Sequence, residues 1–137
     1  MNEEMNPENI ASFKMIKEIN PNVRIYAVQL HPMGPVSSRF LTTVAVYLEL
    51  GDGKYGMAAT SIDAEHLAPM PEGCVQGKLH LAVDIFEPVG DDTSRTHYCG
   101  VDLINPMGSV PAMLVNSFLA ERTTMWEKIK SKISTLP

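Results

Sequence analysis

The side chains that could ligate a metal or act as nucleophiles are scattered along this sequence. They are four histidines and two cysteines: His31, His66, His80, His97, Cys74 and Cys99. A metal site needs three or four converging ligands, whereas His80 shares a predicted strand face with Asp84 alone. We therefore interpret the histidines as solvated surface residues and the cysteines as small buried hydrophobic residues with free thiols.

Motifs that position a catalytic group do not occur in the sequence. There is no G-x-S-x-G elbow, P-loop, H-E-x-x-H motif or Cys–His pair with a local signature. The carboxylates do not pair across a predicted inward face. The sequence therefore predicts no catalytic residue, no metal and no cofactor.

The composition is that of one ordinary globular domain. The chain has 137 residues, of which 45% are hydrophobic and 20% charged, enough to bury a core. Its formal net charge is −5 and it has no basic run, which argues against nucleic-acid binding. The first ten residues are acidic and polar, unlike a signal peptide, and no run reaches the roughly 20 apolar residues of a membrane span. We expect a cytoplasmic, reducing location.

Six runs have the pattern of β-strands, rich in Val, Ile, Thr and Tyr and separated by Gly, Pro and Asn. They are residues 13–19, 23–31, 40–50, 55–63, 78–86 and 96–104. Residues 51–53 predict a tight turn, and residues 64–77 predict a long loop. In residues 78–86 Leu79, Leu81, Val83 and Ile85 alternate with polar positions, which indicates one buried face.

The C-terminal segment changes to a helical pattern. Residues 105–108 break the last strand, Ser109 can cap a helix, and Pro111 suits its first turn. Apolar residues then recur at helical spacing. The predicted fold is therefore α+β: an antiparallel sheet of about six strands covered by one long C-terminal helix.

The last strand and the start of the helix resemble the START (steroidogenic-acute-regulatory-related lipid-transfer) domain family. START domains typically end with an aromatic-x-x-Q-V-D strand, then P-K-G-S-hydrophobic-P, then x-W-L-V-N opening the last helix. Here residues 95–116 read RTHYCGVDLINPMGSVPAMLVN. Without a gap, residues 103–105 stand at Q-V-D, 106–109 at P-K-G-S and 111–116 at P-x-W-L-V-N.

A second segment, residues 34–40 (GPVSSRF), resembles the family's G-P-V-S-x-R-D loop. Three residues depart from the family pattern: Asn105 replaces Asp, Met113 replaces Trp, and Phe40 replaces Asp. The acid–arginine pair of sterol-binding members would fall near Tyr26 and at Ala45, so it is absent here. The resemblance covers about residues 12–133, the last two-thirds of a START domain. The family's first helix, three strands and two short helices have no counterpart.

The resemblance implies a helix-grip fold: a curved antiparallel sheet packed on the C-terminal helix, with one lipid in an apolar cavity between them. It implies a single domain with a loose terminus (1–10), a sheet (11–106) and a lid helix (109–135). The residues expected to line the cavity are Tyr26, Val28, Thr43, Ala45, Tyr47, Leu81, Val83, Ile85, Cys99, Val101, Leu103, Met113, Leu114 and Phe118. In the 40–50 run, hydrophobicity alone would point Val44, Val46 and Leu48 inward, and we follow the family register instead.

The resemblance also implies how the domain works. It is expected to bind and transfer a phospholipid or sterol without catalysis, and to touch a membrane only transiently. The final helix and the loops 31–39 and 64–77 would open to exchange the lipid. We interpret Arg39 as a structural loop anchor. The alternatives are a related helix-grip enzyme such as a polyketide cyclase, a lipid-sensing interaction module, or a remnant without a ligand.

Overall fold

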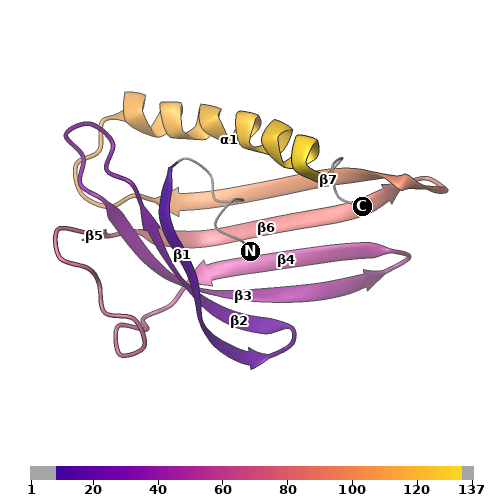
Figure 1. Cartoon of the computed structure of the whole chain (residues 1–137), viewed down its shortest axis with the longest axis horizontal. Coiled ribbons are helices and arrows are strands. Elements are labelled where there is room, and N and C mark those ends of the chain that lie inside the picture. The colour runs from indigo at the N-terminus through magenta and orange to yellow at the C-terminus, as the bar shows by residue number, and fades with distance from the viewer. Residues whose placement is uncertain (1–8, 134–137) are drawn as a thin grey trace.

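The computed structural model describes residues 9–133, apart from the side chains of Thr93 and of several residues in the C-terminal helix. The predicted loose terminus and the predicted end of the last helix thus lie largely outside the described residues. Within these described residues there are seven strands and one helix: β1 Ile10–Asn20, β2 Val23–Leu30, β3 Arg39–Gly51, β4 Lys54–Ser61, β5 Val75–Gln76, β6 Lys78–Val89, β7 Asp92–Asn105 and α1 Ala112–Ile133. Each of the six predicted strands is present, so the antiparallel prediction is confirmed (Figure 1).

The strands form one sheet in the order β1-β2-β3-β4-β6-β7. Tight turns join β1 to β2, β3 to β4 and β6 to β7. The β3–β4 turn needs positive φ at three successive residues, Gly51, Asp52 and Gly53, which explains its glycines. The sheet curves, and α1 runs across one of its sides (Figure 1).

Strand β5 was not predicted. It consists of two residues of the loop between β4 and β6, and it pairs with β3 in parallel. The amide of Val75 donates to the carbonyl of Ser38, and the amide of Gly77 donates to the carbonyl of Phe40. A two-residue pairing between distant segments has no local periodicity, so the sequence pattern did not reveal it.

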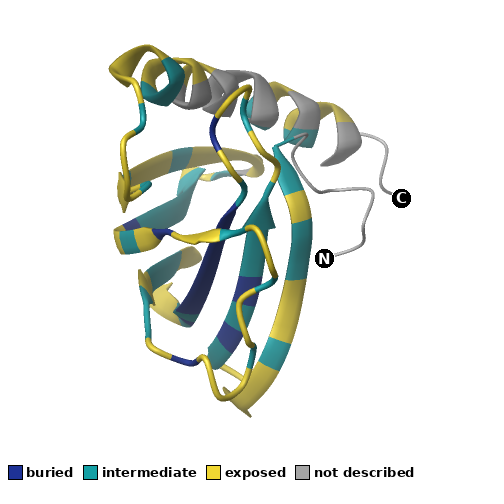
Figure 2. Cartoon of the chain, turned by 90° about the vertical axis from the view of Figure 1, so that its left-hand side faces the viewer, coloured by how far each residue is buried: buried dark blue, intermediate teal, exposed yellow. Residues whose placement is uncertain are grey.

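The buried residues gather on the central strands rather than at the sheet edges (Figure 2). At the start of β3 both faces are covered, because the segment after β4 folds over Phe40 and Thr42. The Thr42 hydroxyl donates to the carbonyl of Ile62 at 2.7 Å, and Ala64 beside it is buried. This end of β3 is the firmest part of the core.

Arg39, the first residue of β3, is 7% exposed and binds backbone oxygens. Its guanidinium donates to the carbonyls of Pro106 at 2.7 Å, Ser37 at 2.5 Å and Met107 at 3.1 Å. Met107 has a φ of 56°, a left-handed conformation that is strained for a methionine. Arg39 therefore ties the loop before β3 to the turn that leads into α1, which confirms its interpretation as a loop anchor.

Replacing Arg39 by Met should leave these three carbonyls without the donors that they have now. Since hydrogen bonds from a charged group contribute about 1.5–3 kcal/mol each and do not add fully, we expect the free energy of unfolding to fall by roughly 2–3 kcal/mol. Urea denaturation measures this. Arg95→Met is the matched control: its ion pair with Asp92 is exposed, so the loss should stay below about 1 kcal/mol. Equal losses for the two variants would contradict the anchoring role.

Candidate lipid-binding face

The side of the sheet that meets α1 is identified by three aromatic rings. Trp126 of α1 lies with its ring centroid 3.9 Å from that of Tyr98 on β7 and 6.3 Å from that of Phe86 on β6. Phe86 and Tyr98 are directly paired across their strands. We call the side that carries these two rings the helix face, and the opposite side the outer face.

Strand pairing identifies which residues of the other strands lie on the helix face, because directly opposed residues in an antiparallel pair point to the same side. From Phe86 the register leads through Tyr55 on β4 to Glu49 on β3. Alternation along β3 then places Thr43, Ala45 and Tyr47 on the helix face. Their partners extend it onto β2 with Tyr26 opposite Thr43.

The β2 and β3 part of the predicted cavity therefore comes together on one face. Its members are Tyr26, Val28, Thr43, Ala45 and Tyr47. The family register predicted this orientation of β3, and the hydrophobicity of Val44, Val46 and Leu48 would have reversed it. Whether these residues contact a lipid stays a prediction.

The β6 and β7 part of the prediction needs correction. Six residues expected in the same cavity lie on the outer face: Leu81, Val83, Ile85, Cys99, Val101 and Leu103. Three of them are strongly exposed: Leu81 at 45%, Val101 at 60% and Leu103 at 60%. Period-2 alternation finds the two faces of a strand but does not say which one meets the rest of the protein. The prediction takes the more apolar face of each strand as the interior one, and in β6 and β7 this face is the outer one.

The cavity residues predicted in α1 have different outcomes in the structure. Met113 is 77% exposed, so the structure does not place it in an enclosed cavity. Leu114, one position further round the helix, is half-buried. The side chain of Phe118 lies outside what the structure describes.

Residues that the sequence reasoning missed occupy the helix face of β4, β6 and β7. They are Ala59, Ala82, Asp84, Gly100 and Asp102. Polar side chains in β6 and β7 indicated a solvated face, which explains the omission. The signal that would have found them is the register of β3, because its helix face continues onto β4 and β6 by pairing.

Two tyrosines form the polar centre of the β2–β3 part of this face. Their hydroxyls are hydrogen-bonded at 2.9 Å between Tyr26 and Tyr47. The ring of Tyr26 contacts that of Phe13, and the guanidinium of Arg24 lies 5.4 Å from the Tyr47 ring centroid. Burial, and then the hydrogen bond with Tyr26, raise the pKa of Tyr47 to about 12. The Tyr47 hydroxyl is therefore a neutral hydrogen-bonding group at physiological pH.

A second polar pair joins β6 and β7. The Tyr98 hydroxyl donates to the Asp84 carboxylate at 2.6 Å and crosses over Gly100 to reach it. A Cβ at position 100 would collide with that hydroxyl and with the carboxylate, so any other residue here would displace the Tyr98–Asp84 pair. Asp102 also lies on the helix face, in the row next to Asp84. The helix face is thus more polar, and more acidic, than the sequence suggested.

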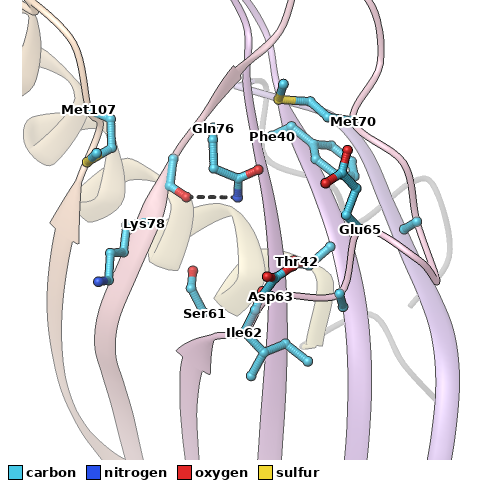
Figure 3. Close-up of a pocket in the computed structure, with 13 residues that line it drawn as sticks. Phe40, Thr42, Ser61, Ile62, Asp63, Glu65, Met70, Gln76, Lys78 and Met107 are labelled. Carbon is cyan, nitrogen blue, oxygen red and sulfur yellow. Dashed lines mark hydrogen bonds between the residues drawn. The ribbon is translucent and has the colours of Figure 1, made fainter.

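A separate pocket of about 520 Å³ lies at one end of the sheet (Figure 3). Phe40, Met70 and Glu65 border it on one side, and Lys78 and Met107 on the other (Figure 3). None of the residues predicted to bind lipid lines it. Phe40 alternates with helix-face positions of β3, so this pocket is distinct from the candidate lipid-binding face.

These features define a helix-grip domain, in which a curved antiparallel sheet presents one face to a C-terminal helix. The family model described as the START domain matches residues 7–136. The chain therefore belongs to the START domain family. No helix among residues 9–133 is long and apolar enough to cross a bilayer.

Solved structures support the fold. The chain is similar to human StAR-related lipid transfer protein 5, with 20% identity and a TM-score of 0.74 over 89% of this chain and 58% of that one. It is similar to human STARD10, with 18% identity and a TM-score of 0.72 over 88% and 49% of the two chains. A STAR-related lipid transfer protein fragment from Xanthomonas axonopodis has 19% identity and a TM-score of 0.63 over 90% and 66%. The chain thus spans less than two thirds of the length of the human domains, and no curated protein matches its sequence.

Replacing Tyr26 by Phe should lower the pKa of Tyr47 from about 12 towards 10, the usual tyrosine value. It should stay above 10 because the burial of Tyr47 remains. Because the pKa of Tyr47 is higher in the folded state than in the unfolded state, the protonated form of Tyr47 stabilises the fold. This contribution to the free energy of unfolding is complete below pH 10 and is lost as the pH rises towards 12. Tyrosinate absorbance during an alkaline titration measures this. The control Tyr55→Phe removes an exposed tyrosine and should leave the pKa of Tyr47 unchanged. An unshifted pKa in Tyr26→Phe would show that the hydrogen bond has no effect.

Proposed function

We propose that the chain binds one lipid between the helix face of the sheet and α1 and releases it at a membrane, without catalysing a reaction. Membership of the START domain family supports this proposal. The observation that carries it is a row of alanines across three neighbouring strands of the helix face. Ala45 on β3, Ala59 on β4 and Ala82 on β6 are directly paired in succession.

The alanine row is a strip of short side chains in the helix face. A methyl group is the smallest side chain that still offers apolar contact. The neighbouring row carries Tyr47 and Met57, and the next one carries Tyr55 and Phe86. We propose this strip as the floor on which the acyl or ring portion of the lipid lies. Burying an acyl chain gains about 0.8 kcal/mol per methylene, so a long chain leaves the bilayer only for such a sheltered apolar surface.

The proposed lid consists of α1 and the loop 31–39. The loop 64–77, which was also expected to open, lies over Phe40 and Thr42 on the outer face, so it is not part of the proposed lid. The contact of Trp126 with Phe86 and Tyr98 holds the far part of α1 against the sheet, while Arg39 holds its base. Opening then means breaking the aromatic contact while the base stays anchored. We expect the domain to be cytoplasmic and to meet membranes only while the lipid exchanges.

The polar groups of the helix face favour neutral or zwitterionic lipids. Asp84 and Asp102 lie on this face, together with the hydroxyls of Tyr26 and Tyr47. Arg24, opposite Ala45 on the same face, is already paired with Glu18 at 3.1 Å. A head group with hydrogen-bond donors or a positive charge is compatible with them, whereas an anionic one would have to be desolvated beside like charges. The acid–arginine pair of the sterol-binding members is absent at Tyr26 and Ala45.

A helix-grip enzyme is the second candidate, and one observation favours it. The hydrogen-bonded pair of Asp84 and Tyr98 supplies a carboxylate and a phenol on the face where a substrate would bind, and such pairs can serve acid–base chemistry. Recovery of unchanged lipid after binding supports transfer. If the unmodified chain converts a bound substrate and the Asp84→Asn variant does not, this result would support the enzyme hypothesis.

Replacing Ala45 by Phe should fill the floor of the proposed site, whereas Val46→Phe adds similar bulk to the outer face of the same strand. We expect Ala45→Phe to lower the amount of co-purified or extracted lipid about tenfold, equivalent to ~1.4 kcal/mol, and Val46→Phe to change it little. Native mass spectrometry measures bound lipid, and Trp126 emission on adding phosphatidylcholine vesicles reports the movement of α1. Equal lipid loading in the two variants would place the lipid elsewhere.

Replacing Asp84 by Asn should relax the discrimination against anionic lipids. The amide oxygen still accepts the Tyr98 hydrogen bond, so the fold is kept while one negative charge is removed. We expect the unmodified chain to extract phosphatidylcholine in preference to phosphatidic acid, and Asp84→Asn to raise the uptake of phosphatidic acid about tenfold. Asp91→Asn removes the same charge at the exposed β6–β7 turn and is the control. A preference of the unmodified chain for phosphatidic acid would contradict the proposal.

A further inference from the structure

The row of residues beside the alanine row carries a phenol on one strand and a carboxylate on another. The register pairs Tyr47 on β3 with Met57 on β4, Met57 with Asp84 on β6, and Asp84 with Gly100 on β7. Directly paired residues share a face, so Tyr47 and Asp84 both lie on the helix face, two strand spacings or about 10 Å apart along the sheet. A ligand that lies on the alanine row has both groups beside it.

The two polar groups of this row have opposite hydrogen-bonding character. One of the two hydroxyl protons of Tyr26 and Tyr47 is used in the bond between them, and the other can be donated to a ligand. The Asp84 carboxylate can only accept. One of its oxygens takes the Tyr98 hydroxyl, and a carboxylate has room for further donors. The row therefore suits a ligand with an acceptor towards β3 and a donor towards β6.

The aromatic rings next to Asp84 do not form a cage for a cation. The Tyr98 and Trp126 rings have their centroids 3.9 Å apart, which leaves no space between them. On its other side the Tyr98 side chain passes directly over Gly100. Recognition of a trimethylammonium group uses aromatic ring faces arranged around it. A cationic head group at this place therefore meets the Asp84 carboxylate rather than a set of free ring faces.

The charges on the strands of the helix face favour a positively charged donor near Asp84. Asp102 lies at the β7 end of the alanine row and adds a second negative charge. Alternation also places two arginines on this face, and both are engaged elsewhere. Arg24 is paired with Glu18 at 3.1 Å, and Arg39 donates to three backbone carbonyls. Neither of these cations contacts Asp84.

We propose that Asp84 selects lipids whose ammonium head group carries an N–H. This proposal rests on the proposed function, because it specifies the ligand of the same site. An N–H of an ethanolamine-type head group donates to the Asp84 carboxylate, and the phosphate oxygens face the remaining hydroxyl proton of the Tyr26–Tyr47 pair. Hydrogen bonds between two charged groups are among the strongest in proteins. A choline head group has the same charge but no N–H, so it cannot make this bond.

A series of lipids that differ only in N-methylation tests the proposal. The unmodified chain is incubated with equal amounts of phosphatidylethanolamine, its N-methyl and N,N-dimethyl forms and phosphatidylcholine, all with the same acyl chains. Native mass spectrometry measures the loading of each lipid. The first three keep at least one N–H, and we expect each to load about tenfold more than phosphatidylcholine. The head group grows at every step, whereas the N–H is lost only at the last one, so a fall at that step identifies the hydrogen bond.

Two variants separate lipid selection from a structural role of the Asp84–Tyr98 hydrogen bond. Asp84→Asn keeps this bond through its amide oxygen but removes the charge, and we expect the preference over phosphatidylcholine to fall to about twofold or less. Tyr98→Phe loses the bond but keeps the carboxylate, and the tenfold preference should remain. A purely structural role gives the reverse pattern. Asp91→Asn removes a charge at the exposed β6–β7 turn and should leave the preference unchanged.

The outcomes distinguish this proposal from the proposed function. Equal loading of the four lipids, or a gradual change across the series, overturns the role of Asp84 and leaves lipid binding on the helix face intact. A fall at the last step that persists in Asp84→Asn places the acceptor of the N–H elsewhere and also overturns that role. If none of the four lipids loads, the proposed function fails and this proposal fails with it.

Discussion

The buried guanidinium of Arg39 is the interaction on which the arrangement of sheet and helix depends. A charge taken out of water must be matched by acceptors, and here the acceptors are carbonyls from two segments distant in sequence. One is Ser37, in the loop before β3, and the others are Pro106 and Met107, in the turn before α1. The left-handed Met107 is held in this way. The start of α1 is thereby placed relative to β3.

From this anchor α1 extends along the helix face, and Trp126 meets that face at Phe86 and Tyr98. The helix is thus held at two places of different character: polar and buried at its base, aromatic and half-buried further along. An aromatic contact is easier to break and remake than a buried charge with its acceptors. This difference is what a lid requires, because one end has to stay while the other moves.

The two faces of the sheet reverse the usual distribution of polarity on β6 and β7. The helix face carries Asp84, Tyr98 and Asp102, whereas the outer face carries Leu81, Val101 and Leu103. For a domain that holds an amphipathic ligand, polar groups on the ligand side are needed to orient a head group. The apolar outer face of β6 and β7 is not the side that meets α1. The chain is also shorter than the human START domains whose fold it shares.

The sequence by itself determined the six long strands, their turns, the family and the anchoring role of Arg39. Those features follow from local alternation, turn residues and contiguous motifs. It also oriented β2 and β3 correctly, through the family register. Only the tertiary structure decided which side of β6 and β7 meets α1, and it added the two-residue β5. The physical reason is that alternation is symmetric: a strand with two distinct faces shows the same period whichever face is turned inward, and only its pairing with β3 through β4 resolves the choice.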